Sequence, residues 1–193
     1  YLQQFMLRAY TVTDQAGKSL FAFKLHQFIA GGGKVYTTLE ALGHRSITLD
    51  GQQFVSGDAQ RQRRYFHTHF CRDCGQEYLP VWDTDSPEGR RFDVRNIDER
   101  QHEDEQVKFG FLMPDGHGLW DPGDLERYPE SWLEERADGE WRIKSPQRKY
   151  LPQPVKVRPD GVVTQEQGLQ AWFIPGSFRF CLACGVAHST AGK

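Results

Sequence analysis

Short apolar runs and period-two alternation recur along the chain, and they predict a β-rich α+β protein with few helices. Apolar residues at helical spacing predict helices over residues 1–10 and 124–137. Residues 19–30 are dense in aromatic side chains and fit either a buried helix or a buried strand. Strands are predicted at residues 35–39, 64–70, 76–83, 107–113, 141–144, 155–157 and 162–164.

Dipeptides that favour tight turns join some of these strands. Asp50-Gly51 predicts a hairpin over residues 47–55, and Asp160-Gly161 joins the strands at 155–157 and 162–164. Pro175-Gly176 predicts a final hairpin that delivers the last pair of cysteines. The arms of that hairpin would be residues 171–174 and 178–181, and loops are predicted at 31–33, 85–91 and 114–123.

The four cysteines form two Cys-x-x-Cys pairs, and a glycine directly follows each pair. This spacing lets both sulfurs of one tight turn reach the same metal ion, and the glycine permits the left-handed backbone common in such a turn. The surrounding segments also match, because a Phe precedes the first cysteine of each pair. We therefore predict one structural Zn²⁺ per chain in closed four-sulfur coordination, with the ligands Cys71, Cys74, Cys181 and Cys184.

Each Cys-x-x-Cys pair with its turn forms a knuckle that supplies half of the ligands. Two knuckles that face one ion predict a zinc-ribbon-like core, with residues 85–170 inserted between these two half-sites. Closing the long loop between the pairs costs entropy that grows only logarithmically with loop length, so the separation is acceptable. We expect residues 1–193 to form a single zinc-anchored domain. Because the chain starts with Tyr1, we also expect it to be a fragment of a larger protein.

Other roles for the cysteines stay open at this point. Free core thiols, a disulfide and a redox pair are the alternatives to a metal site. His67, His69 and His188 lie near the pairs in sequence and can serve as substitute ligands or as donors to sulfur. His26 lies within an apolar run, which is more typical of a core histidine than of a ligand.

A formal net charge of −2 excludes nucleic-acid binding driven by the overall charge of the chain. A DNA contact would need a local basic patch, in which interleaved aromatic residues can stack on bases. A solvated surface would have the same composition. The acidic run at 98–105 is predicted to be an exposed helix face, and the alternatives are that it repels nucleic acid or docks a basic partner. The candidate basic groups are Arg61, Arg63, Arg64 and Arg72; Arg90, Arg91 and Arg95; and Arg142, Lys144, Arg148, Lys149, Lys156 and Arg158.

Catalytic and membrane-spanning features are absent from the sequence. The glycines at 31–33 and Lys34 lack the spacing of a phosphate-binding loop, and no complete catalytic motif occurs. No apolar run is long enough to span a membrane, and the cysteine usage favours a cytoplasmic protein. We therefore expect that this chain is not itself an enzyme.

Four segments, at residues 21–29, 35–40, 70–78 and 178–186, carry a family resemblance. Together they resemble the cysteine-rich segment of very large bacterial superfamily 2 DEAD/DEAH-box helicases, related to the Lhr-like and DISARM-type helicases of DNA repair and phage defence. In that family the segment lies between two RecA-like motor lobes. The resemblance implies that ATP and Mg²⁺ bind outside this chain, and it transfers only the four cysteines as functional residues.

The leading hypothesis is a non-catalytic, zinc-stabilised accessory domain of an ATP-dependent DNA helicase. The resemblance implies DNA and the RecA-like lobes of the same chain as its partners. The alternative is a protein-interaction module that docks a partner protein of a defence complex. A DNA-guiding domain should bind oligonucleotides in a strongly salt-dependent manner, whereas a docking module should expose an apolar patch.

Overall fold

The computed structural model describes residues 4–5, 8, 11–13 and 34–188. The chain divides into two compact units, Tyr1–Gly33 and Lys34–Lys193. The helix predicted over 1–10 lies mostly outside the described residues, and the aromatic run at 19–30, His26 and the glycines at 31–33 lie wholly outside them. The fold described below is that of the second unit.

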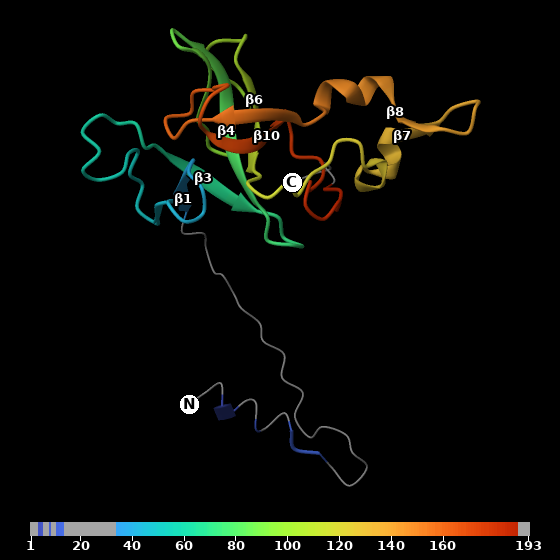
Figure 1. Cartoon of the computed structure of the whole chain (residues 1–193), viewed down its shortest axis with the longest axis horizontal. Helices are drawn as coiled ribbons and strands as arrows, with labels where there is room; N and C mark the ends of the chain where they lie inside the picture. Colours follow the sequence, from blue (N-terminus) through green and yellow to red (C-terminus); the bar gives the residue numbers. More distant parts are fainter. Residues whose placement is uncertain (1–3, 6–7, 9–10, 14–33, 189–193) are drawn as a thin grey trace. The chain divides into compact units, whose positions relative to one another are not determined.

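Antiparallel strands build most of the second unit, which confirms the prediction of a β-rich protein (Figure 1). One sheet has the strand order β2-β1-β3-β4-β6-β10-β9, with β5 paired to β4, and β7 and β8 form a separate two-stranded sheet. The strands are β1 Val35–Thr38, β2 Ile47–Thr48, β3 Tyr65–Phe70, β4 Glu77–Ser86, β5 Gly89–Val94, β6 Lys108–Pro114, β7 Leu133–Glu135, β8 Trp141–Ile143, β9 Gln153–Val157 and β10 Leu169–Pro175. Within residues 34–188 the helical elements are three 3₁₀ segments, η1 Leu125–Arg127, η2 Glu130–Trp132 and η3 Ser145–Tyr150.

Strand β4 begins soon after the first cysteine pair and organises the sheet. It pairs with β3 at its start, with β6 along its middle and with β5 over its second half. Its residues from Tyr78 to Trp82 are all buried, although successive side chains point to opposite faces. The apolar run in the sequence therefore reflects a strand that is covered on both faces.

Backbone pairing closes part of this sheet into a ring. Arg91 of β5 bridges to Val162, and Val163 bridges to Val157 of β9. The Phe92 N–H donates to the Gly161 carbonyl at 2.8 Å within this closure. Gly161 has φ +93°, and a Cβ there would lie 2.2 Å from the Phe92 carbonyl oxygen, so the close approach requires glycine.

The ring encloses one of two hydrophobic cores. Its members come from β3, β4, β5, β6, β9 and β10 and from Leu39 after β1, and they include Val81, Phe92, Leu112, Val157 and Phe173. The second core includes the first cysteine of each pair and is rich in aromatic residues. That core consists of Cys71, Tyr78, Phe111, Met113, Trp120, Tyr128, Trp132, Ile174, Phe180, Cys181 and Leu182.

The helix predicted over residues 124–137 is wrong, because η1, η2 and β7 occupy this stretch. Pro129 biases the preceding residue away from helical angles, and Tyr128 accordingly has φ −83° and ψ 148°. Tyr128 and Trp132 are nevertheless buried. The apolar spacing therefore identified core residues correctly but assigned them the wrong secondary structure.

Two of the predicted hairpins are also wrong, because other segments take the strand edges. Ile47 and Thr48 pair with β1, while Phe54 bridges to Arg64. Strand β10 pairs with β6 on one edge and with β9 on the other, so residues 178–181 cannot join it. The turn at Asp160-Gly161 is confirmed, since the Gly161 N–H donates to the Arg158 carbonyl at 2.9 Å.

Residues 85–170 contribute strands to the same sheet as β3 and β4. The loop predicted at 85–91 is instead a tight hairpin, in which β4 continues to Ser86 and β5 starts at Gly89. The Ser86 hydroxyl donates to the Gly89 carbonyl at 2.8 Å across this turn. Strand β4 therefore runs further than the polar sequence of its second half indicates.

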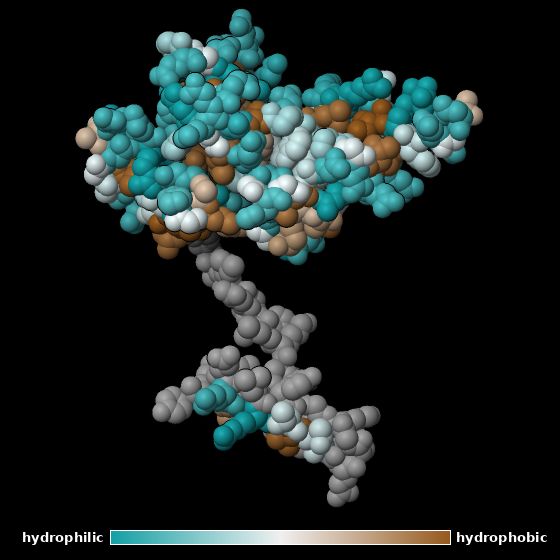
Figure 2. All heavy atoms as spheres, viewed as in Figure 1, coloured by the Kyte–Doolittle hydropathy of each residue, from teal (hydrophilic) through white to brown (hydrophobic). Residues whose placement is uncertain are grey.

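The surface of this unit is mostly hydrophilic on the face drawn in Figure 2, with apolar side chains gathered in smaller patches. In the described part of the chain, no helix combines the length and the apolar character needed to cross a membrane.

Candidate metal centre

The first cysteine pair lies in the turn between β3 and β4. The Gly75 N–H donates to the Cys71 carbonyl at 2.9 Å, and the Cys71 N–H donates to the Gln76 carbonyl at 2.8 Å. Gly75 has φ +79°, in the left-handed region that favours glycine. The turn therefore places Cys71 and Cys74 on one side of a hairpin whose strands are already paired.

The second pair has the same backbone arrangement. The Gly185 N–H donates to the Cys181 carbonyl at 2.8 Å, and the Cys181 N–H donates to the Val186 carbonyl at 2.9 Å. Gly185 has φ +73°. Within residues 34–188, the segments beside this turn form one bridge, between Phe180 and Ala187, and the His188 N–H donates to the Arg179 carbonyl at 2.7 Å. The glycine that follows each pair in the sequence thus has the geometric role predicted for it.

The four sulfur atoms come together, although residues 75–180 separate the pairs in sequence. All four lie within 4.8 Å of one another. The Cys71 and Cys184 sulfurs are 3.9 Å apart, and the Cys74 and Cys181 sulfurs are 3.6 Å apart. These separations are far longer than an S–S bond of about 2.05 Å, so the cysteines are free thiols.

Two of the sulfur–sulfur distances match the edge length of a metal-binding tetrahedron. Four sulfurs at about 2.3 Å from a central Zn²⁺ lie about 3.8 Å apart along each edge of a regular tetrahedron. The two contacts that join the pairs, 3.9 and 3.6 Å, lie on either side of this value. Each contact links one pair to the other, so a single ion at the centre would be shared by both knuckles.

The electrostatic environment differs among the thiols. Burial raises the pKa of Cys181, Cys74 and Cys184 above that of a free thiol. Burial acts in the same direction at Cys71, but the backbone N–H groups of Cys74 and Asp73 outweigh it and lower the pKa to about 6. A central cation would favour the thiolate form of all four side chains.

Tyr78 supports the site from β4, and the sequence analysis did not select it as a site residue. Its hydroxyl donates to the Cys181 sulfur at 3.1 Å and accepts from the Leu182 N–H at 2.8 Å. Burial raises the pKa of Tyr78, so the hydroxyl keeps its proton and acts as a donor. Its position in the first strand after Cys74 was the available signal, because a buried tyrosine needs a partner for its hydroxyl.

His188 lies next to the sulfur cluster. Its Nε2 atom is 3.8 Å from the Cys71 sulfur and 3.9 Å from the Asp73 carboxylate. Cys71, Asp73 and His188 therefore form a second group of possible ligands beside the four cysteines. His67 and His69 belong to neither group among the described residues, and His67 instead packs edge-on against Tyr36 at 4.6 Å.

Aromatic side chains surround the second knuckle. The Phe180 ring lies 5.7 Å from Trp120, 5.7 Å from Tyr128 and 5.2 Å from Trp132. Phe180, Cys181 and Leu182 are almost completely buried. The segment between β6 and β7 thus covers the knuckle that has little strand pairing of its own.

Most arginines of the three basic groups form ion pairs or contact aromatic rings within the protein. Arg63 pairs with Glu40, Arg90 with Asp83, and Arg158 with both Asp160 and Glu88. Arg95 is 1% exposed, and its guanidinium lies 5.1 Å from the ring centres of Phe109 and Phe111. Further pairs join Arg64 and Arg91 to Asp93, and Arg142 to Glu134. These arginines therefore contribute less free positive charge to the surface than the sequence indicates.

Comparison of the chain with protein-family models, with curated proteins and with solved structures found no match. The resemblance to superfamily 2 helicases therefore stays a prediction.

Proposed function

We propose that this chain is a zinc-stabilised, non-catalytic domain, in which one metal ion ties the segment around Cys181 and Cys184 to the β3–β4 hairpin. The observation that carries the proposal is the cluster of four cysteine sulfurs within 4.8 Å of one another. Two glycine-terminated knuckles with matching backbone hydrogen bonds support it.

The ligand chemistry favours a structural metal. Four thiolates complete the tetrahedral coordination of Zn²⁺ and leave no position for water or substrate, which a catalytic zinc requires. Iron also accepts four thiolates, so metal analysis has to separate these two ions. We favour zinc because closed four-cysteine sites built from Cys-x-x-Cys pairs are typical of structural zinc.

The metal would stabilise the tertiary structure. Among the described residues, the strand pairing around the second knuckle is one bridge, between Phe180 and Ala187. A shared ion would link this knuckle to Cys71 and Cys74, which the paired strands β3 and β4 position. Metal-binding free energy then contributes directly to folding free energy.

Metal analysis and chelation test this proposal. The purified chain should contain one zinc per molecule, and a chelator should lower its melting temperature by at least about 10 °C. This lower bound assumes a loss of roughly 5 kcal/mol, about half of what structural zinc contributes in small domains, and a shift of at least about 2 °C for each kcal/mol. Hydrogen exchange should accelerate more at residues 178–188 than in β3 and β4.

Re-addition of Zn²⁺ should restore the melting temperature, whereas Mg²⁺ should not, because Mg²⁺ prefers oxygen ligands. Stoichiometric iron in place of zinc would overturn the identity of the metal but keep the site. A chain that contains no metal and melts at the same temperature with and without chelator would overturn the whole proposal.

DNA contact and partner docking stay predictions. The internal pairing of Arg63, Arg90 and Arg158 gives the DNA contact no additional support. Oligonucleotide binding at low salt tests it, since binding through phosphates weakens steeply as salt increases.

A further inference from the structure

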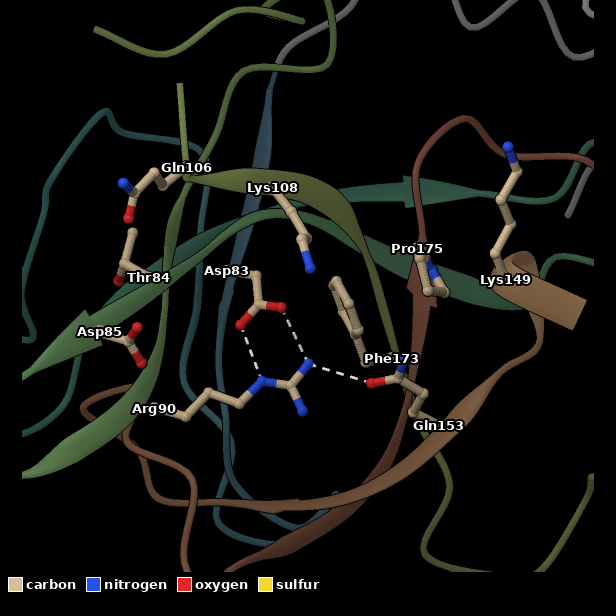
Figure 3. A pocket seen from close by; sticks show the side chains of 10 residues that line it. All are labelled: Asp83, Thr84, Asp85, Arg90, Gln106, Lys108, Lys149, Gln153, Phe173 and Pro175. Carbon is tan, nitrogen blue, oxygen red and sulfur yellow. Dashed lines mark hydrogen bonds and ion pairs between the residues drawn. The ribbon is translucent and has the colours of Figure 1, made fainter. Parts of the chain in front are cut away.

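A polar cavity of about 380 Å³ lies away from the cysteines, among β4, β5, β6, β9 and β10 (Figure 3). These strands belong to the ring of paired segments, and the ring core residue Phe173 also lines the cavity. Open ends of closed sheets are common positions for ligand sites, and this volume is in the range of small-molecule pockets. The complete lining is Asp83, Thr84, Asp85, Arg90, Gln106, Lys108, Lys149, Gln153, Phe173 and Pro175.

Arg90 forms a rigid base for this cavity. Its Nε and Nη2 atoms donate to the two oxygens of Asp83 at 2.8 and 2.9 Å, and Nη2 also donates to Gln153 at 3.2 Å. The guanidinium lies 5.1 Å from the ring centres of both Phe92 and Phe173. Because these contacts hold the side chain in one conformation, a ligand that binds to it would order little additional structure.

The positive charge of Lys108 is not compensated in this way. Lys108 lies directly opposite Asp83 in the β4–β6 register, but Arg90 occupies both oxygens of that carboxylate. Within residues 34–188, neither Lys108 nor Lys149 forms an ion pair. Figure 3 shows the Lys108 side chain pointing toward Asp83 and the ring of Phe173, with Lys149 at the margin beside Pro175.

From this arrangement we propose that the cavity binds a small anion through a phosphate or carboxylate group placed against Lys108, with Lys149 as a weaker contributor. Three cationic and two anionic side chains line the cavity, and Arg90 neutralises Asp83. The remaining charges are the two positive charges of Lys108 and Lys149 and the one negative charge of Asp85, so the cavity has a net positive charge. Asp85 stands on the other side of the cavity from Lys149 and would repel a ligand that carries negative charge along its whole length.

Titration of the folded 193-residue chain tests this site with two probes, inorganic phosphate and malonate, at constant ionic strength. We expect saturable binding of at least one probe, followed by calorimetry or by amide chemical shifts. Phosphate binding without malonate binding would assign the site to phosphoryl groups. The reverse result would assign it to carboxylates.

Single substitutions decide whether the binding takes place in this cavity. Lys108→Gln should weaken binding at least tenfold, Lys149→Gln should weaken it about two- to threefold, and Asp85→Asn should strengthen it severalfold, since a charge within the cavity changes anion affinity according to its sign and distance. Lys156→Gln is the matched control, because Lys156 lies on β9 outside the cavity lining. All variants should keep the melting temperature of the parent chain.

Absence of saturable binding for both probes would overturn the proposal. Equal weakening by Lys108→Gln and Lys156→Gln would also overturn it, because binding would then depend on overall charge. The site does not depend on the proposed zinc, so failure of anion binding in a folded, zinc-loaded chain leaves the metal proposal intact.

Discussion

Phe70 and Phe180 occupy equivalent positions, each directly before the first cysteine of a pair, yet Phe70 is 53% exposed and Phe180 is 2% exposed. The turns that follow them have the same backbone hydrogen bonds and the same left-handed glycine. Strands β3 and β4 flank the first pair, whereas an aromatic cluster and Tyr78 surround the second.

This difference shows that one local motif can be supported in two ways. Backbone pairing holds the first knuckle, so its phenylalanine need not be buried. In the part of the chain that the structure describes, the second knuckle has one bridge, and buried aromatic side chains pack around it. Substitutions of the supporting residues should therefore change the free energy of unfolding by different amounts in the two knuckles. Substitutions of the glycines, whose local geometry is the same, should change it by similar amounts.

Loss of a buried metal ligand should have the largest effect. We expect Cys181→Ser to abolish metal binding and cooperative unfolding at 25 °C, because structural zinc contributes on the order of 10 kcal/mol in small domains. Cys71→Ser should also lose the metal but retain more protection of β3 and β4 in hydrogen exchange. Metal content, calorimetry and exchange rates measure these outcomes.

Ala183→Ser is the matched control, because it introduces a hydroxyl into the same turn and leaves all four sulfurs in place. It should keep one metal per chain. A soluble Cys181→Ser chain that melts cooperatively at the parental temperature would contradict the structural role of the metal.

The two phenylalanines give the sharpest test of the difference in support. Phe180→Ala should lower the free energy of unfolding by about 3–5 kcal/mol, since it leaves a cavity among Trp120, Tyr128 and Trp132. Phe70→Ala should change it by less than about 0.5 kcal/mol, because Phe70 is mostly exposed. Denaturant unfolding measures both values, and equal losses would refute the comparison.

Removal of the Tyr78 hydroxyl should lower stability by an intermediate amount, and its direct effect should be confined to the second knuckle. Tyr78→Phe should lower the free energy of unfolding by about 1–3 kcal/mol, because the Leu182 N–H loses its buried acceptor. It should also weaken zinc affinity about 10- to 100-fold, since the Cys181 sulfur loses a donor. A competition assay with a chromogenic chelator measures the affinity.

Tyr65→Phe is the control for this substitution, since the Tyr65 hydroxyl has no hydrogen-bond partner among residues 34–188. It should leave zinc affinity unchanged. Unchanged affinity in Tyr78→Phe would show that the hydrogen bond to sulfur does not tune the site.

The glycine after each pair should show the smallest effect, and the two knuckles should agree. Gly75→Ala and Gly185→Ala should each lower the free energy of unfolding by about 1–2 kcal/mol, because alanine is strained at φ +79° and φ +73°. Gly116→Ala is the control, since it has an ordinary φ and open space around its Cβ. A large difference between the two glycine variants would mean that the local geometry is not equivalent.

Local signals in the sequence selected the four cysteines that the structure brings together, and they predicted several strands correctly. The Cys-x-x-Cys-Gly spacing is a property of a single turn, so it selects Cys71, Cys74, Cys181 and Cys184 without knowledge of the rest of the chain. Alternating or continuous apolar runs similarly predicted β1, β3, β4 and β6. Whether the two pairs share zinc stays a prediction until the metal is measured.

The sequence did not predict which segments would pair with which strand edges. The predicted hairpins at 47–55 and 171–181 failed because β1, β6 and β9 occupy the edges that their arms would have used. Similarly, the spacing of Tyr128 and Trp132 fits a helix, but Pro129 and the burial of both rings against Phe180 produce 3₁₀ turns instead.

The sequence by itself determined two Cys-x-x-Cys-Gly turns and a set of strands, because turn geometry and side-chain alternation depend on neighbouring residues. The tertiary structure alone decided that the sulfurs meet, that Tyr78 donates to Cys181, and that Lys108 and Arg90 line one cavity. These relations join residues far apart along the chain. They depend on which strand edges pair and which apolar surfaces are buried together, and those choices are made by the whole fold.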